Sequence, residues 1–184
     1  MNLYKKINLD LSSIQVSKLK GSFYEGYGPF FKTYNILDQE YLDNYLKTKV
    51  IFHIPATHLG YTEVLYKGVT TPHTDTSMTA LNYYINSNTG ETFFYKAIDP
   101  SQKIEAIRHL DQNVRTGSET YEYSLSNLEV VDSFLTNDHE AWLLNAHNIH
   151  CVRKTKFDKP RTILRWLWYD VPFDQVLNSI EILD

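Results

Sequence analysis

The residues best suited to chemistry in this 184-residue chain are a histidine and an aspartate two positions apart, His73 and Asp75. On an extended strand, side chains at positions i and i+2 point to the same side. An imidazole nitrogen and a carboxylate oxygen could therefore meet at one point in space. A second histidine from further along the chain would complete a three-ligand face, and His147 and His150 are available.

Two histidines and one carboxylate with open coordination positions are the ligand set typical of non-haem Fe(II) sites. A His-x-Asp triplet alone is weak evidence, because such triplets also occur at solvated strand ends. His147 and His150 are three residues apart, so they point to different sides and only one is expected to bind a metal. We favour His150, and His147 would orient a ligand through a hydrogen bond. The remaining histidines are interpreted as surface or structural residues: His53, His58, His109 and His139.

An anion-binding strand is predicted near the C-terminus. Arg161 and Arg165 alternate there with Ile163 and Leu167 on one face, and the other face is also largely apolar. This pattern indicates a strand buried on both sides, where an unpaired charge is costly. For Arg161 we favour a carboxylate-bearing small molecule, which a guanidinium can meet with two parallel hydrogen bonds. For Arg165, a salt bridge to an internal Asp or Glu is an equal alternative.

The composition is that of an ordinary soluble globular protein, with 42% hydrophobic and 22% charged residues. The net charge of −4 argues against a general nucleic-acid binder. Cys151 is the single cysteine, which fits a reducing compartment. The N-terminus lacks the apolar region of a signal peptide, and no run approaches the roughly 20 apolar residues of a spanning helix. We therefore expect a cytoplasmic protein without membrane contact.

Short strands dominate the predicted secondary structure. With 14 Tyr, 9 Phe and 3 Trp, the chain is rich in residues that favour strands. Helices are predicted over 36–48, with Asp38 as the N-cap, over 99–110, and within 173–183. Strands are predicted at 50–54, 62–66, near His73, and at 78–85, 91–97, 121–125, 129–135, 141–144 and 161–169. The pattern indicates a mainly β, single domain over 1–184 with its core at about 50–170: a sandwich or jelly roll with N-terminal and flanking helices.

In their order and spacing, several of these pieces resemble the Fe(II)- and 2-oxoglutarate-dependent dioxygenases, and within them the prolyl 4-hydroxylase-like branch. The resemblance covers roughly residues 61–168. Its pieces are Leu65-Tyr66-Lys67-Gly68, Pro72-His73-Thr74-Asp75, Tyr83-Tyr84-Ile85-Asn86, Thr89-Gly90-Glu91-Thr92-Phe93-Phe94, and His150 followed eleven residues later by Arg161. Thr89 stands where the family's turn has its first glycine.

The resemblance implies a double-stranded β-helix (jelly roll) whose metal ligands for Fe(II) are His73, Asp75 and His150. It implies hydroxylation of a C–H bond of a small-molecule or peptide substrate, with a peptidyl or free amino acid favoured. O2 and 2-oxoglutarate would be consumed, succinate and CO2 would be released, and ascorbate would serve as a reductant.

The resemblance also implies a cosubstrate clamp. Arg161 would bind the distal carboxylate of 2-oxoglutarate, Tyr84 would donate its hydroxyl to the same group, and Tyr66 would lie near the metal. Arg165 would contact the substrate or the other carboxylate. An unbroken strand from the first metal ligand would put Tyr83, rather than Tyr84, on the ligand side. The clamp therefore requires a bend after Asp75, for instance at Thr76-Ser77.

Two other functions remain possible for a protein of this fold. One is a non-catalytic cupin-like protein that binds a metal or small ligand, and the other is a metal-dependent isomerase or hydrolase. A dicarboxylate clamp beside the metal would favour the dioxygenase, because neither alternative needs one. The tryptophans are predicted to pack in the core rather than line a substrate groove: Trp142, Trp166 and Trp168.

Overall fold

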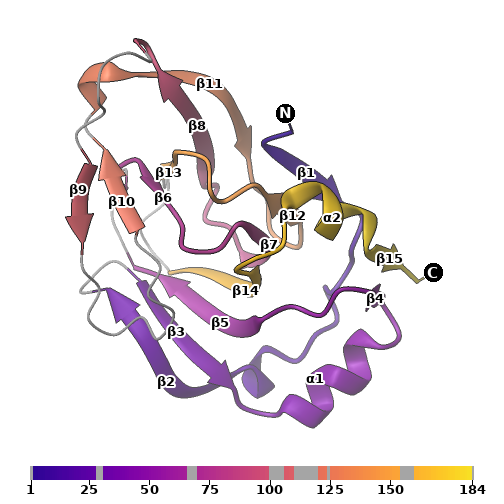
Figure 1. The fold of residues 1–184 in the computed structure, drawn as a ribbon. Helices are drawn as coiled ribbons and strands as arrows, with labels where there is room; N and C mark the ends of the chain where they lie inside the picture. The colour runs from indigo at the N-terminus through magenta and orange to yellow at the C-terminus, as the bar shows by residue number, and fades with distance from the viewer. Residues whose placement is uncertain are drawn as a thin grey trace.

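The computed structural model describes residues 2–27, 31–65, 70–99, 106–109, 120–123, 125–153 and 160–183. Two large antiparallel sheets face each other (Figure 1). The seven-stranded sheet has the order β1 (Tyr4–Ile7), β12 (Ala141–Leu144), β7 (Thr79–Asn86), β14 (Arg161–Trp168), β5 (His58–Val64), β3 (Phe31–Ile36), β2 (Lys20–Tyr27). The six-stranded sheet has the order β11 (Leu128–Leu135), β8 (Glu91–Ala97), β13 (His150–Arg153), β6 (His73–Thr74), β10 (Thr120–Tyr123), β9 (Ala106–His109).

The path of the chain between the sheets is that of a jelly roll. From β5 to β8 each successive strand lies in the opposite sheet, and the same alternation runs from β11 to β14. The result is two four-stranded groups, β12-β7-β14-β5 and β11-β8-β13-β6, that face each other. All pairings are antiparallel, as expected for a fold without helical crossovers. The predicted double-stranded β-helix is therefore confirmed.

The helices flank this core. In α1 (Gln39–Leu46), the Asp38 side chain accepts a 2.9 Å hydrogen bond from the Tyr41 amide, so the predicted N-cap is confirmed. Near the C-terminus, α2 (Phe173–Asn178) is followed by β15 (Ile180–Ile182), which pairs with β4 (Val50–Phe52). Two 3-10 turns, Val16–Lys18 and Leu125–Asn127, complete the described elements. No helix in the described ranges is long and apolar enough to cross a membrane.

The helix predicted over 99–110 is wrong where the structure describes it. Residues 106–109 form β9, which pairs with β10 along its whole length. Cross-strand hydrogen bonding, which a local pattern does not reveal, overrides the helical spacing of the apolar residues here. Positions 100–105 and 110 of that prediction lie outside the described residues.

The two faces of the seven-stranded sheet have different neighbours. On the outer face, Leu81, Leu164 and Trp166 pack with Trp168 against side chains of α1, α2 and the N-terminal segment. Figure 1 shows α1 on the side of this sheet away from the six-stranded sheet. Each fully buried large apolar side chain contributes about 1.5–3 kcal/mol. The inner face looks toward the six-stranded sheet and carries Tyr84, Arg161 and Arg165.

Candidate metal centre

His73, Asp75 and His150 come together between the two sheets. His73 on β6 and His150 on β13 are direct register partners, and Asp75 follows immediately after β6. The Nε2 atom of His73 lies 3.6 Å from Oδ1 of Asp75, and that of His150 lies 3.9 Å from Oδ2. One ligand atom from each residue lies within 4.8 Å of the others, an arrangement that could hold a metal ion.

Backbone carbonyls orient both imidazoles for metal binding. The Nδ1 atom of His73 lies 2.7 Å from the carbonyl oxygen of Thr71, and that of His150 lies 2.9 Å from the carbonyl oxygen of Asn148. A carbonyl oxygen only accepts, so Nδ1 donates in each ring, and in the neutral ring Nε2 keeps its lone pair. Both lone pairs are therefore available at the side of the ring that faces Asp75. This is the usual support of metal-binding histidines, and the donor set fits a divalent metal.

The charges of the site also suit a metal. Burial opposes ionisation of Asp75, but Arg165 and the two histidines outweigh it and lower the pKa of this carboxyl to about 2. Burial, with His73 beside it, lowers the pKa of His150 to about 4. At neutral pH the site thus offers a carboxylate and a neutral imidazole, the protonation states that metal ligands require.

Arg165 lies directly beside the metal ligands. Its Nη2 group donates a hydrogen bond to Oδ2 of Asp75. The predicted salt bridge to an internal acid is thereby confirmed, and the acid is a ligand of the candidate metal centre. The Nε atom of Arg165 is buried and has no partner. Arg165 therefore binds Asp75 through Nη2, and its Nε–H group remains available to donate to a ligand.

Arg161 is a buried cation without a counter-ion in the described part of the chain. It is 1% exposed, and its Nη2 group donates to the hydroxyl of Thr136 at 3.2 Å. Its Cζ atom lies 4.3 Å from the ring centroid of Tyr84, and its Nε atom has no partner. Burial lowers the pKa of this guanidinium, and no acidic residue within the described ranges offsets the effect. A Cβ atom at Gly90 would lie 2.9 Å from Cζ of Arg161, so the guanidinium occupies the space that a glycine leaves open.

The bend required after Asp75 is present. The backbone bends at residues 76–78, and the chain passes from β6 in one sheet to β7 in the other. Tyr84 consequently faces the interior with Arg161, whereas Tyr83 lies in the outer core, where its hydroxyl contacts Nδ1 of His139 at 3.1 Å. Tyr66, the other tyrosine expected near the metal, lies outside the described residues.

Unpartnered polar atoms gather on the inner faces of the sheets. Among the described residues, five buried side-chain atoms lack a hydrogen-bond partner: Nε2 of His58, Oδ1 of Asn82, Oγ1 of Thr92, Nε of Arg161 and Nε of Arg165. Asn82 is the register partner of Arg165, and Thr92 lies two residues from Phe94, which pairs with His150. Strand alternation thus points all five side chains between the sheets. Buried polar atoms are rarely left unpaired, so this concentration indicates a polar ligand.

Three of these residues were missed by sequence reasoning. Asn82 and Thr92 lie in predicted strands, but their pairing with Arg165 and with the strand of His150 follows only from the sheet register. His58 was interpreted as a surface or structural histidine; the structure shows a partly buried ring whose enclosed Nε2 atom has no partner. His58 lies on β5, which pairs with β14, the strand of Arg161 and Arg165. Only the order of the strands in the sheet reveals that these residues are neighbours.

The other described histidines and the tryptophans do not belong to the group of metal ligands. His147 is exposed and does not belong to the metal-ligand group, so the choice of His150 agrees with the geometry. His53 is exposed and lies 2.9 Å from a Glu181 carboxylate oxygen. The side chain of His109 is outside the described set. Trp166 and Trp168 pack in the outer core, and Trp142 stacks on Phe134 with ring centroids 4.2 Å apart, as predicted for core residues.

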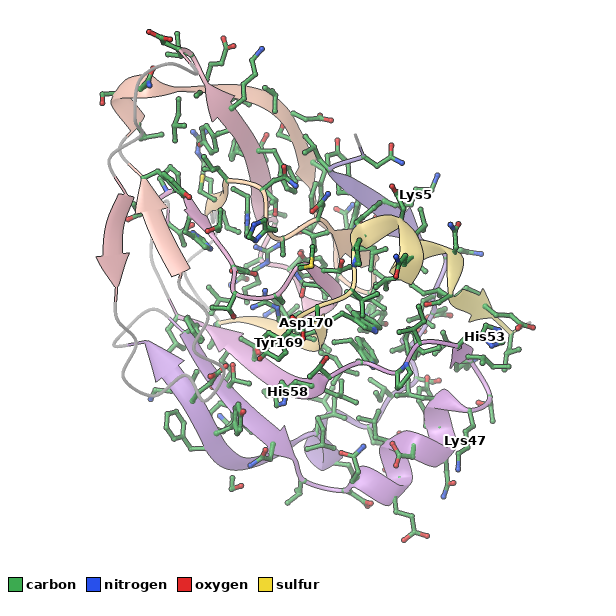
Figure 2. The ribbon with its side chains drawn as sticks, viewed as in Figure 1. Lys5, Lys47, His53, His58, Tyr169 and Asp170 are labelled. Carbon is green, nitrogen blue, oxygen red and sulfur yellow. The ribbon has the colours of Figure 1, made fainter. Side chains whose placement is uncertain are left out.

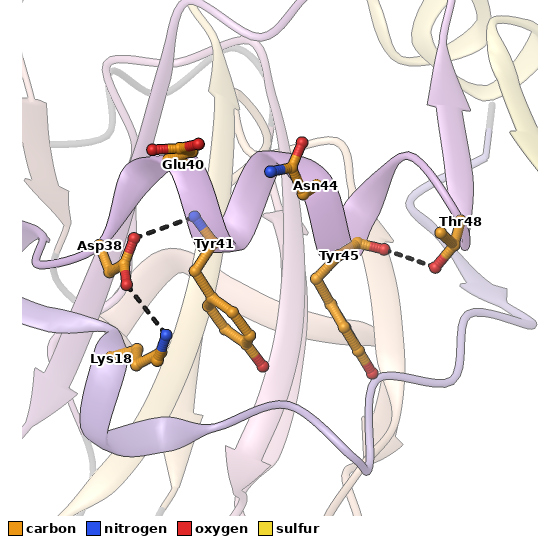
Figure 3. A pocket seen from close by; sticks show the side chains of 7 residues that line it. All are labelled: Lys18, Asp38, Glu40, Tyr41, Asn44, Tyr45 and Thr48. Carbon is orange, nitrogen blue, oxygen red and sulfur yellow. Dashed lines mark hydrogen bonds and ion pairs between the residues drawn. The ribbon is translucent and has the colours of Figure 1, made fainter.

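A depression along α1 lies away from this centre (Figure 3). Several of its polar groups already have partners: Lys18 bonds Asp38 at 3.1 Å and lies 4.5 Å from the Tyr41 ring centroid. The Tyr45 carbonyl accepts from Thr48. None of its lining residues belongs to a metal-ligand group. We therefore place no chemistry there.

Comparisons with known proteins yield a likeness of fold alone. No protein-family model matches the chain, and no curated protein sequence matches it. Among solved structures, it is similar to the crystal structure of vicilin from Corylus avellana (hazelnut), with a TM-score of 0.40 and 8% sequence identity. The match covers 88% of this chain and 36% of the vicilin chain, so this chain spans about a third of that structure. The chemistry of the site therefore rests on its own residues.

Proposed function

We propose that this protein is an Fe(II)- and 2-oxoglutarate-dependent dioxygenase that hydroxylates a C–H bond of a small molecule or peptide. His73, Asp75 and His150 would hold the metal. When bound, Fe(II) together with 2-oxoglutarate and O2 supplies the oxidising chemistry, with succinate and CO2 as products. Cofactors carry such chemistry, and the protein contributes binding, orientation and exclusion of water.

The observation that carries this proposal is the buried, uncompensated Arg161. Leaving a guanidinium unpaired in the interior costs several kcal/mol, which is rarely tolerated without a purpose. No acidic residue pairs with it among the described residues, so an anionic ligand is the remaining counter-charge. A metal-binding triad and a buried anion receptor between the same two sheets suit a small acid that also chelates the metal. 2-Oxoglutarate has both features, a distal carboxylate and a 2-oxo acid end.

The surrounding residues have distinct tasks in this proposal. The Arg161 guanidinium binds the distal carboxylate, and Nε and Nη atoms on one edge of the fork can both donate to it. Thr136 holds the guanidinium through Nη2, and Tyr84 packs against its face. The Asn82 amide lies 3.4 Å from the Tyr84 hydroxyl and so orients it toward the ligand. Arg165 holds one oxygen of Asp75, which leaves the other for the metal.

Binding of 2-oxoglutarate tests the proposal directly. Calorimetry with protein loaded with redox-inert Mn(II) measures affinity, and succinate release with Fe(II) and ascorbate measures turnover. In Arg161→Met, loss of a charged buried hydrogen-bonded pair should weaken 2-oxoglutarate binding by at least about 30-fold. The free energy of unfolding of the ligand-free protein should not fall, because the variant removes an unpaired buried charge at similar volume.

A matched control comes from Arg153 on β13, an exposed arginine whose guanidinium lies 4.8 Å from the Phe93 ring centroid. Arg153→Met should leave 2-oxoglutarate affinity unchanged. If the wild-type protein binds Mn(II) but neither binds 2-oxoglutarate nor forms succinate, the dioxygenase proposal fails. A non-catalytic, metal-binding jelly-roll protein would then be the better description.

A further inference from the structure

A second unpaired polar group lies on the inner face, on the far side of Arg165 from Asn82. Arg165 is the register partner of Gly60 on β5, and His58 is the register partner of Leu167. The Nε2 atom of His58 lies 2.9 Å from the position of a Cβ atom on Gly60, so the imidazole extends along β5 toward Arg165. The glycine makes room for this ring, since a Cβ atom would collide with it.

Both side chains present a buried nitrogen without a partner. These atoms are Nε2 of His58 and Nε of Arg165, and the charge of Arg165 acts on the His58 ring. Burial and this neighbouring charge lower the pKa of His58, so the ring is neutral at pH 7 and can donate one N–H. Arg165 itself is fixed by its bond to Asp75. Two donors on adjacent strands therefore face one small volume beside the metal ligands.

The aromatic surroundings extend this arrangement toward solvent. Tyr24 on β2 stacks on His58, with ring centroids 4.7 Å apart and an interplanar angle of 20°, and it is 42% exposed. Tyr24, Glu25 and Arg165 interact electrostatically with the Tyr169 hydroxyl, so Tyr169 borders the same region. Figure 2 shows His58 and Tyr169 near β5 and the end of β14. A ligand here would reach from an exposed aromatic ring inward to Arg165.

The charge balance favours an acid at this position. This step rests on the proposed function, because it counts a divalent metal and dianionic 2-oxoglutarate. Among the groups that would contact the metal or the cosubstrate, Arg161, Arg165 and the metal carry four positive charges, and Asp75 with the cosubstrate carries three negative charges. One further carboxylate would neutralise the centre, and in a site of low dielectric this matters more than in water.

We propose that His58 and Arg165 form a second anion subsite that takes the carboxylate of the substrate. The substrate class is then a small carboxylic acid, such as a free α-amino acid, rather than an internal residue of a peptide. Tyr24 covers the subsite and packs on the body of the substrate. His58 is a specificity-determining residue in this arrangement, and Arg165 serves both Asp75 and the substrate.

The test compares free L-α-amino acids with their carboxamides, which retain the ammonium group and side chain and lack the carboxylate charge. Protein labelled with 15N-histidine reports binding through the His58 ring resonances, assigned by their loss in His58→Leu. The proposal expects at least one free acid to shift these resonances saturably, with its carboxamide at least about 10-fold weaker, as expected for loss of a charged hydrogen bond. Titrations use protein loaded with Zn(II), which is redox-inert and diamagnetic and so leaves the ring resonances visible, with and without 2-oxoglutarate.

Variants separate this subsite from the cosubstrate clamp. Calorimetry should show that His58→Leu weakens the amino acid by about 10-fold or more and leaves 2-oxoglutarate affinity within about 2-fold. Arg161→Met should give the reverse pattern. His53→Leu is the matched control, because His53 is an exposed histidine that contacts Glu181, and it should change neither affinity.

The outcomes distinguish the two proposals. If 2-oxoglutarate binds but no free acid shifts His58, or if acids and carboxamides act equally, the second anion subsite is refuted and the dioxygenase proposal stands. If free acids shift His58 selectively while 2-oxoglutarate neither binds nor turns over, the subsite stands and the dioxygenase proposal falls. If His58→Leu fails to fold, His58→Gln provides the resonance assignment in its place, and the wild-type resonances then decide the matter.

Discussion

The two faces of the seven-stranded sheet are made by alternate residues of the same strands, yet they differ in kind. On the outer face of β14, Leu164, Trp166 and Trp168 are buried among apolar side chains of the helices and the N-terminal segment. On the inner face of the same strand, Arg161 and Arg165 carry buried nitrogens without partners. Leu164, Trp166 and Trp168 thus serve packing, whereas Arg161 and Arg165 of the same strand face the site between the sheets.

This difference indicates how the fold divides its tasks. The outer face supplies stability through apolar burial, which allows the inner face to retain polar groups that cost stability without a ligand. The inner face is itself divided. Toward β1, Tyr4 and Trp142 of this face pack on Phe94 and Phe134 of the six-stranded sheet. Toward β5, the arginines of this face lie opposite the metal ligands, which come from the six-stranded sheet.

The largest expected effect is on the outer face. Leu164 is fully buried there, and Leu164→Ala should lower the free energy of unfolding by about 3 kcal/mol, through lost burial and the cavity left behind. Urea denaturation measures this change. Thr92→Val is the inner-face counterpart, because it removes an unpartnered hydroxyl at nearly constant volume. It should be neutral or stabilising, and a comparable loss in both variants would contradict the division between the faces.

The next largest effect is expected for metal binding, which involves only the space between the two sheets. Saturation with Mn(II) at about one hundred times its Kd should raise the free energy of unfolding of the wild-type protein by about 2.7 kcal/mol. His150→Ala should lose this increment, because it removes a metal ligand. His147→Ala is the control, since this neighbouring histidine is exposed and should keep the increment. Equal losses in the two variants would remove His150 from the site.

Acid should also weaken the structural end of the interior, through Glu140. Burial opposes ionisation of Glu140, but bonds from Lys6, Asn137 and Trp142 lower its pKa to about 2. A depressed pKa stabilises the fold above the unfolded value of 4.5, and this contribution is lost as the pH falls from there through about 2.

We expect the Glu140 contribution to be about 1 kcal/mol, because its exposed partner Lys6 is screened by solvent. Urea denaturation of the wild type and Glu140→Gln should differ by this amount at about pH 7 and converge toward about pH 2. A difference that is independent of pH would show that the carboxylate charge does not hold β1 to the turn before β12.

The smallest effect concerns the turn that links the two sheets between β7 and β8. Asn88 and Thr89 both have positive φ, 50° and 49°, and the Gly90 amide donates to the Ser87 carbonyl at 3.1 Å, as in a type I′ turn. A β-branched residue is strained there, so Thr89→Gly should raise the free energy of unfolding by about 0.5 kcal/mol after the entropy cost of glycine. Thermal unfolding measures this increase. Gly90→Ala next to it should instead displace Arg161 and reduce 2-oxoglutarate binding.

Local patterns were sufficient for several elements. The limits predicted for β8 and β12 are those observed, and the Asp38 cap is present. Strand alternation placed Arg161 and Arg165 on one buried face. The same alternation showed that Tyr84 could face the metal only if the chain bends after Asp75, and this bend carries the chain from β6 to β7. These features follow from sequence because strand periodicity, capping and parity depend on neighbours along the chain.

The sequence by itself determined which residues could bind a metal and an acid, and that the fold is a β jelly roll. Only the tertiary structure decided that His150 rather than His147 meets His73, that Asp75 is the acid bonded to Arg165, and that no acid pairs with Arg161 in the described residues. It also brought His58 and Asn82 to either side of Arg165. The reason is physical: alternation along a strand fixes the face of each side chain, and only the register between distant strands fixes what lies opposite.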